Sequence, residues 1–153
     1  MCRAIVFQSA SGERVEVKPA AVQELRAHAQ YERGSKEDGG ILIGRRILDS
    51  PDVVVDCITF AFPTDRQSSL SFVRNPRGHQ EMLDRAWEDS GGVATYLGEW
   101  HTHPTPNAAP SGVDLRNCAE LSLRSPEPLV FLIVGTERIG CWGHGGQWQQ
   151  EGL

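Results

Sequence analysis

The sequence lacks a long hydrophobic run, and the longest one, residues 129–134, has only six residues. A helix needs roughly 20 predominantly apolar residues to cross a bilayer, so we expect no membrane-spanning segment. The apolar part of the N-terminus, at residues 4–7, is also too short for a secretory signal. These two absences predict a cytoplasmic protein that has no membrane partner.

Basic residues are fewer than acidic ones, and no two cysteines lie close in sequence. Lys and Arg number 15 against 20 Asp and Glu, which gives a net charge of −5 at pH 7. A nucleic-acid-binding domain usually carries a basic stripe, so this balance argues against a nucleic-acid partner. Without a Cys-x-x-Cys pair or an export signal, we expect buried, reduced thiols rather than disulfides. The four cysteines are Cys2, Cys57, Cys118 and Cys141.

No internal repeat, low-complexity tract or linker interrupts the 153 residues, which fit a single domain spanning residues 1–153. Apolar and β-branched runs between turn signals predict strands, and apolar residues at helical spacing predict helices. We expect strands at residues 3–8, 14–18, 41–48, 53–60, 72–73, 93–100, 129–134, 138–142 and 147–150. We expect helices at residues 20–32 and 76–90 and after Ser111, with a loop at residues 63–71. This order predicts an α/β domain with a mixed β-sheet and helices packed against it.

Two of the predicted helices carry apolar residues at helical spacing, which predicts faces that pack on the core. These residues are Met82, Leu83, Ala86 and Trp87 in one helix and Leu115, Ala119 and Leu121 or Leu123 in the other. His28 and His79 lie on predicted helices, and we expect both to be solvated. Trp100 points away from its neighbouring histidine by strand alternation, so we expect it to support the strand from behind.

The segment from Gly98 to Asp114 concentrates metal-binding residue types. His101 and His103 are two apart, so an extended chain directs both imidazoles to the same face. Pro104 should end the strand there and leave the imidazoles at a sheet edge. Asp114 returns in the first turn of the following helix. Two imidazoles and one carboxylate are a ligand set that holds zinc and leaves its fourth position open, as in catalytic zinc sites.

Each half of this pattern also has a simpler explanation. A His-x-His pair occurs often without a metal, and Ser111 with Asp114 has the spacing of a capping box at a helix start. The two halves together, joined by a Pro-rich loop after a buried strand, favour a metal site. Hydrolysis would also need a base, and the spacing leaves Glu99 and Glu37 as competing candidates.

The same residues resemble the signature of the JAB/MPN metalloenzymes, also called JAMM proteases. That signature is a Glu, a distant His-x-His-Pro, a Ser seven intervening residues later, and an Asp three residues beyond the Ser. Here it is matched from Glu37 to Asp114 with every spacing kept. Residues 37–44 read Glu-Asp-Gly-Gly-Ile-Leu-Ile-Gly, similar to the Glu-x-Gly-Gly-Ile-Leu-Leu-Gly that prokaryotic members typically carry.

The resemblance implies a role for each residue of the signature. His101, His103 and Asp114 would bind one zinc ion, and Glu37 would be the general acid and base. Ser111 would donate a hydrogen bond to the oxyanion of the tetrahedral intermediate. Glu99 and Cys118 would then stand outside the set of reacting groups. The implied fold is the cytidine-deaminase-like α/β one, although a deaminase itself is disfavoured because no His-x-Glu with Cys-x-x-Cys occurs.

The implied activity is that of a zinc-dependent isopeptidase or peptidase. It would hydrolyse the amide bond after the C-terminal tail of a ubiquitin-like modifier or of a conjugated nucleotidyltransferase, the cyclic-nucleotide synthase of a CBASS antiphage system. The cognate conjugating enzyme is a further implied partner. We expect the substrate tail to lie extended in a groove, as an added strand at a sheet edge. The alternatives are a non-catalytic MPN-type scaffold and a peptidase that processes a sulfur-carrier protein.

Overall fold

The computed structural model describes residues 2–32, 34, 36–60, 66–67, 72–73, 76–143 and 145–152. The strands in this part are β1 (Ile5–Gln8), β2 (Arg14–Val17), β3 (Gly39–Arg46), β4 (Val53–Ile58), β5 (Arg66–Gln67), β6 (Phe72–Val73), β7 (Thr95–Thr102), β8 (Val130–Val134), β9 (Ile139–Gly143) and β10 (Gly146–Gln150). The helices are α1 (Pro19–Ala27), α2 (Pro76–Asp89) and α3 (Gly112–Arg124). Among these helices, none has the length and apolar character that a membrane crossing requires. Apart from β5, the loop predicted at residues 63–71 lies outside the described residues.

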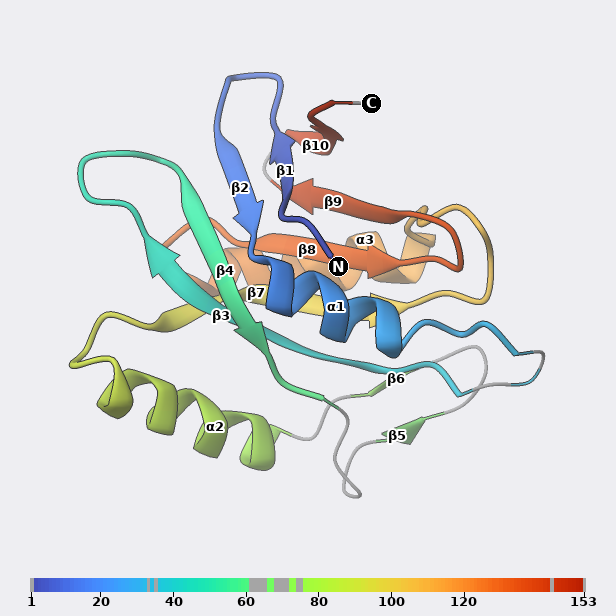
Figure 1. Ribbon diagram of the computed structural model, residues 1–153, viewed down its shortest axis with the longest axis horizontal. Coiled ribbons are helices and arrows are strands. Elements are labelled where there is room, and N and C mark those ends of the chain that lie inside the picture. The colour runs from blue at the N-terminus through green and yellow to red at the C-terminus, as the bar shows by residue number, and fades with distance from the viewer. Residues whose placement is uncertain are drawn as a thin grey trace.

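Eight of the strands close into a barrel in the order β1-β10-β9-β8-β7-β3-β4-β2 (Figure 1). The pairs β2–β4 and β7–β8 are parallel and the other neighbours are antiparallel, so the sheet is mixed as predicted. The closure itself was not predicted, because it depends on the pairing of β1 with β10 from the far end of the chain. A closed sheet presents no edge strand, so the expected addition of a substrate strand cannot use the barrel. The finer cytidine-deaminase-like assignment stays a prediction.

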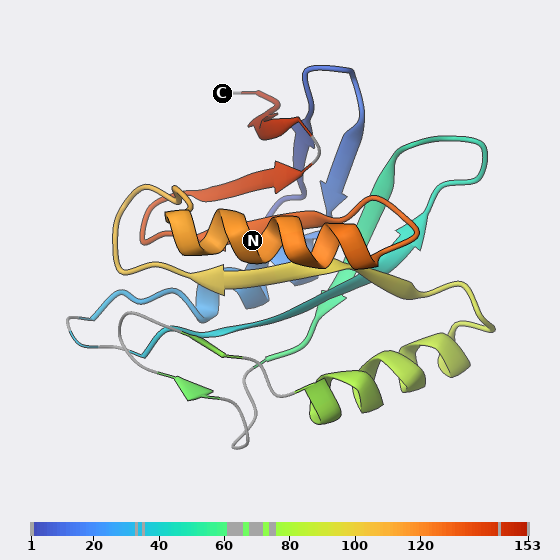
Figure 2. The same ribbon diagram turned by 180° about the vertical axis from the view of Figure 1, so that it is seen from behind.

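Helices α1 and α3 lie on opposite faces of β7 and β8 (Figures 1 and 2). Helix α1 lies on the inner side, where Ala21, Val22 and Leu25 are completely buried in the core. Pro19 begins the helix, consistent with the fixed backbone of proline at a first helical turn. The helix ends at Ala27, five residues before the predicted end at residue 32.

A β-bulge in β7 decides which side chains of this strand face the core. Its pairing with β3 shifts between Leu42 and Ile43, opposite Gly98. Leu97 and Trp100 are both buried in the core although strict alternation would put them on opposite faces. Gly98 has a φ of 150°, and a Cβ there would lie 1.7 Å from the carbonyl oxygen of Val130. The bulge directs Trp100 inward, as expected.

Strand β7 extends farther than predicted. It continues through Thr102, and His101 is paired on one side with Gly39 of β3 and on the other with Ile133 of β8. The prediction that Pro104 leaves His101 at a sheet edge is therefore wrong. Pairing on both sides keeps the strand extended up to the residues just before the proline.

The predicted apolar face of α3 is exposed. The helix has no buried residue, and the exposed fractions of Leu115 and Leu123 are 51% and 88%. The side chains that approach the barrel are instead Asp114, Cys118 and Leu121, which follow one another at helical spacing. Of the apolar residues predicted for this face, only Leu121 is half-buried, and the others are exposed.

Several solvation predictions also need correction. His79 on α2 is completely buried, and its Nδ1 shares a hydrogen bond with the hydroxyl of Thr59. His28 is half-buried and forms an ion pair with Asp38. On α2 the predicted core stripe is only half-buried, and Trp87 is 56% exposed. All four cysteines are free as predicted, but only Cys141 is fully buried and Cys57 is exposed.

Candidate active site

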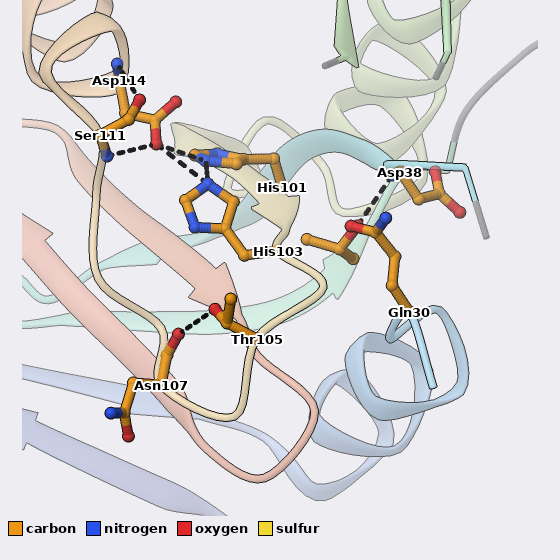
Figure 3. Close-up of polar contacts among 9 residues, drawn as sticks. Gln30, Asp38, His101, His103, Thr105, Asn107, Ser111 and Asp114 are labelled. Carbon is orange, nitrogen blue, oxygen red and sulfur yellow. Dashed lines mark hydrogen bonds and ion pairs between the residues drawn. The ribbon is translucent and has the colours of Figure 1, made fainter. Parts of the chain in front are cut away.

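Two histidines and one aspartate converge beside the end of β7, as the sequence predicted (Figure 3). The Nε2 atoms of His101 and His103 are 3.1 Å apart. Oδ2 of Asp114 lies 3.2 Å from the first and 3.0 Å from the second. With zinc bonds of about 2.0–2.1 Å, two corners of a tetrahedron lie about 3.3 Å apart. The three ligand atoms therefore match one face of a zinc tetrahedron, and the fourth corner is left for a non-protein ligand.

Each of the three side chains is held by backbone structure. His101 is fixed by the pairing of β7 with both of its neighbours. The backbone N–H of His103 donates to the carbonyl oxygen of Val134 at 2.9 Å, which ties the chain to β8 beyond the end of β7. Asp114 comes from the first turn of α3, on the outer face of the barrel.

The capping box of α3 is present, and it is compatible with a metal-binding role for Asp114. The hydroxyl of Ser111 accepts from the N–H of Asp114 at 3.1 Å, and the N–H of Ser111 donates to Oδ2 of Asp114 at 2.8 Å. This is the same oxygen that faces both histidines. The cap therefore orients the carboxylate, and the hydroxyl proton of Ser111 is not used by the cap.

The ionisation of Asp114 and that of His103 depend on each other. Burial raises the pKa of Asp114, but hydrogen bonds from His101 and His103 outweigh it and bring the pKa well below its usual range. The hydrogen bond to Asp114 raises the pKa of His103, against the opposing effect of burial. In the metal-free chain this carboxylate therefore stays ionised and attracts protons onto His103, the same protons that a bound cation would replace.

Glu37 completes the cluster from a different part of the chain. It lies just before β3, whose first residue Gly39 is paired with His101, and its exposed fraction is only 6%. Ligand atoms of Glu37, His101 and His103 all lie within 4.8 Å of one another. Burial raises the pKa of Glu37, partly offset by the two histidines. A carboxylate with a raised pKa beside a metal site is suited to accept and return a proton.

Glu99, the other candidate base, lines the same cavity but takes no part in a comparable cluster among the described residues. The cavity has a volume of about 310 Å³ and is also lined by Glu37, His101, Asp114 and residues of α3. The geometry therefore favours Glu37, rather than Glu99, as the carboxylate beside the two histidines. Cys118 lines the cavity too, and burial together with Asp114 and Glu99 raises the pKa of its thiol to about 12. A thiol with such a pKa stays protonated at neutral pH.

One group near the site was missed by the sequence analysis. Thr102, between the two histidines, is completely buried and contacts Asp38 and Gln30 through its hydroxyl. The only signal in the sequence was a polar residue two positions after Trp100, where strand alternation places it on the core-facing side.

Comparisons with known proteins identify the family of the chain. Residues 18–145 match the family described as prokaryotic homologs of the JAB domain. A CD-NTase/cGAS isopeptidase from Escherichia coli (strain TW11681) is 30% identical over 135 residues, which cover 88% of this chain and 85% of that protein. Another CD-NTase/cGAS isopeptidase, from Vibrio cholerae serotype O1, is 33% identical over 131 residues, covering 86% and 82%.

A solved structure supports the fold alone. Protein DSY2949 from Desulfitobacterium hafniense superimposes with a TM-score of 0.59 at 24% identity, covering 88% of each chain. The family match spans most of the sequence, and the two isopeptidases align over most of their length. The chain belongs to the family of prokaryotic homologs of the JAB domain.

Proposed function

We propose that the protein is a zinc-dependent isopeptidase that hydrolyses the amide bond after the C-terminal tail of a ubiquitin-like modifier or of a conjugated CD-NTase. The observation that carries the proposal is the triangle of ligand atoms from His101, His103 and Asp114, with Glu37 beside it. The names of the relatives support the bond type, because an isopeptidase cleaves an amide formed by a C-terminal carboxyl group.

In this proposal His101, His103 and Asp114 hold the metal. When bound there, zinc supplies Lewis acidity and lowers the pKa of water to about 7. Glu37 accepts a proton from the attacking water and delivers it to the leaving nitrogen, a task that its raised pKa suits. The hydroxyl of Ser111 donates a hydrogen bond to the oxygen on which negative charge develops. The hydroxyl can do this while accepting from the N–H of Asp114, since it has one donor and two acceptor sites.

The cavity beside these residues provides room for an extended tail. It adjoins a second cavity of about 340 Å³, and the two share Leu121 and Arg124 of α3 as lining residues. The second cavity is also lined by Leu83 of α2, Tyr96 and Leu129. The tail would thus run between α2 and α3 toward Glu37. Because the barrel is closed, backbone pairing with the tail is left to a segment outside the barrel.

The non-catalytic scaffold is disfavoured by the convergence of all five signature residues. A scaffold has no need for a base beside an ordered set of metal ligands, yet Glu37 is buried there despite the cost of burying a carboxylate. A sulfur-carrier substrate would use the same chemistry, so only a cleavage assay with a sulfur-carrier tail distinguishes it.

The experiment measures bound zinc and cleavage with the same purified protein. Reporters would be fused after a CD-NTase tail, a ubiquitin-like tail and a sulfur-carrier tail, and incubated with wild type, Glu37→Gln and the exposed control Glu88→Gln. We expect one zinc per chain in all three proteins and cleavage by wild type and Glu88→Gln only. The tail that is cut identifies the substrate class. A protein that binds zinc but cuts none of the tails would be the scaffold.

A further inference from the structure

The hydroxyl of Thr102 joins two segments that the active site needs to keep in register. It accepts a hydrogen bond from the backbone N–H of Asp38 at 2.9 Å. It donates one to Oε1 of Gln30 at 2.7 Å. Thr102 and Gln30 are both buried, with exposed fractions of 0% and 3%. The hydroxyl proton is therefore committed to Gln30, and a lone pair is committed to Asp38.

The bond to Asp38 acts directly on the backbone of Glu37. The N–H of Asp38 belongs to the peptide group that contains the Cα of Glu37, and a peptide group is planar. On its other side Asp38 accepts a hydrogen bond from the backbone N–H of Thr102, through its carbonyl oxygen at 2.9 Å. Thr102 thus contacts Asp38 twice, once by main chain and once by side chain. These two bonds fix the distance between Glu37 and the strand that carries His101.

The side chain of Asp38 is held as well. One carboxylate oxygen accepts from the N–H of Gly39 at 2.8 Å, and the other forms an ion pair with Nδ1 of His28. The His28 ring is stacked on Phe60 at a centroid distance of 4.7 Å. Figure 3 shows Gln30 and Asp38 together on one side of the histidine pair, with Ser111 and Asp114 on the other. Glu37 is therefore anchored from the side opposite to the metal-bearing helix.

We propose that Thr102 and Gln30 are positioning residues that hold Glu37 at working distance from the metal ligands. The inference rests on the proposed function, since it assigns Glu37 the role of base. The histidines face one side of the chain and the Thr102 hydroxyl faces the other. The tripeptide from His101 to His103 therefore positions both the proposed metal ligands and the proposed base. Displacing a catalytic group by about 1 Å lowers turnover by up to about 100-fold.

The test uses the zinc-loaded chain with Thr102→Val, which keeps the shape of the side chain and removes its hydroxyl. Thr102→Ser restores the hydroxyl, and Thr105→Val makes the same change at an exposed threonine after the histidines. Gln30→Met probes the network from its other end, should Thr102→Val fail to fold. Each protein is assayed for zinc per chain, hydrogen exchange of the Asp38 amide, kcat and KM. Each change is also made in the Glu37→Gln background.

We expect Thr102→Val to keep one zinc and its KM, to lose about 10- to 100-fold in kcat, and to exchange the Asp38 amide at least about 10-fold faster. Gln30→Met should show a smaller loss, and Thr102→Ser and Thr105→Val should stay near wild type. In the Glu37→Gln background Thr102→Val should cost nothing more, because its effect passes through Glu37.

Two results would overturn the positioning role while leaving the proposed function intact. One is an unchanged kcat in Thr102→Val when its Asp38 amide has lost protection. The other is an equal loss of kcat in the wild-type and Glu37→Gln backgrounds, which indicates a general structural effect. If the wild-type protein itself cuts none of the tails, the proposed function fails and the positioning role fails with it.

Discussion

The inner and outer faces of β7 are packed in opposite ways. On the inner face Trp100 and Thr102 are fully buried, and α1 covers the barrel with three completely buried residues. On the outer face His101 remains partly accessible, and α3 lies across β7 and β8 without a single buried residue (Figure 2). Both helices are amphipathic in sequence, yet only one of them is used for the core.

The inner face of β7 therefore contributes mainly to stability, and the outer face carries the candidate active site. Burying apolar side chains stabilises a fold by roughly 25 cal/mol per Å², so α1 carries far more of that stabilisation than α3 does. Helix α3 instead presents Asp114 to the histidines and lines the cavity with Cys118 and Leu121. Sequence changes on the inner face should therefore lower stability, and changes to the site residues on the outer face should lower turnover.

The largest effect on activity should come from Glu37→Gln. Loss of a general acid and base lowers kcat by about 100- to 10,000-fold. Since the pKa of the buried carboxylate is raised by burial, a neutral amide should be tolerated without a loss of stability. Steady-state kinetics and thermal unfolding of the zinc-loaded protein measure the two quantities. Wild-type activity in Glu37→Gln would transfer the role of base to another residue, with Glu99 the first to examine.

Ser111→Ala should lower kcat by about 100- to 1,000-fold, as removal of an oxyanion donor does. It should also cost about 1 kcal/mol of stability, because the cap of α3 is lost. Ser111→Asp separates the two effects, since aspartate caps helices as well as serine does and its ionised side chain has no proton to donate. We expect Ser111→Asp to recover the melting temperature and not the turnover. Full recovery of both would show that the serine acts only as a cap.

Leu25→Ala tests the inner face. The side chain is completely buried in the core, so its truncation should cost about 2–5 kcal/mol in the free energy of unfolding. His101 and the proposed zinc site lie on the other face of β7, so turnover per folded molecule should be unchanged. Urea denaturation measures the free energy of unfolding. Turnover is divided by the zinc content of the sample, which gives the turnover per folded molecule. A loss of turnover larger than the loss of folded protein would show that the two faces are coupled.

Zinc affinity should fall with decreasing pH because protons compete for His103. Hydrogen bonding to Asp114 raises the pKa of His103 in the metal-free chain, and zinc needs the neutral imidazole. Below that pKa we expect affinity to drop about tenfold per pH unit for this one proton. The carboxylate of Asp114 has a lowered pKa and stays ionised, so it does not add to the pH dependence of zinc affinity.

Zinc titrations across neutral pH measure this slope. NMR titration of the metal-free chain supplies the control, since Asp114→Asn should lower the pKa of His103. An affinity that is independent of pH would place the bound zinc elsewhere.

The convergence of His101, His103 and Asp114 could be predicted from the sequence because the contributing segments are local. His101 and His103 are two residues apart on an extended segment, and Ser111 with Asp114 forms a capping box whose geometry follows from three-residue spacing. The choice between Glu37 and Glu99 could not be made locally. It depends on the pairing of Gly39 with His101, a contact between segments about 60 residues apart. The same pairing extends β7 to Thr102, two residues beyond the predicted end at Trp100.

The contacts of Thr102 and the orientation of α3 were not predicted, for a related reason. Periodicity identifies an apolar stripe, but it does not say which stripe faces the sheet. In α3 Asp114 lies against the histidines, and Leu115 and Leu123 of the predicted stripe remain 51% and 88% exposed. Closure of the barrel likewise depends on contacts between the two ends of the chain.

The smallest effect should come from Leu123→Ala on the outer face. This side chain is 88% exposed on α3, so truncation removes little buried apolar area, and alanine is a strong helix former. We expect a change within about 0.5 kcal/mol in the free energy of unfolding and no change in turnover. Leu25→Ala is the matched substitution on α1, and the two together measure how unequally the helices contribute to stability. A loss above about 2 kcal/mol for Leu123→Ala would mean that this leucine is covered in solution, for example by a second copy of the chain.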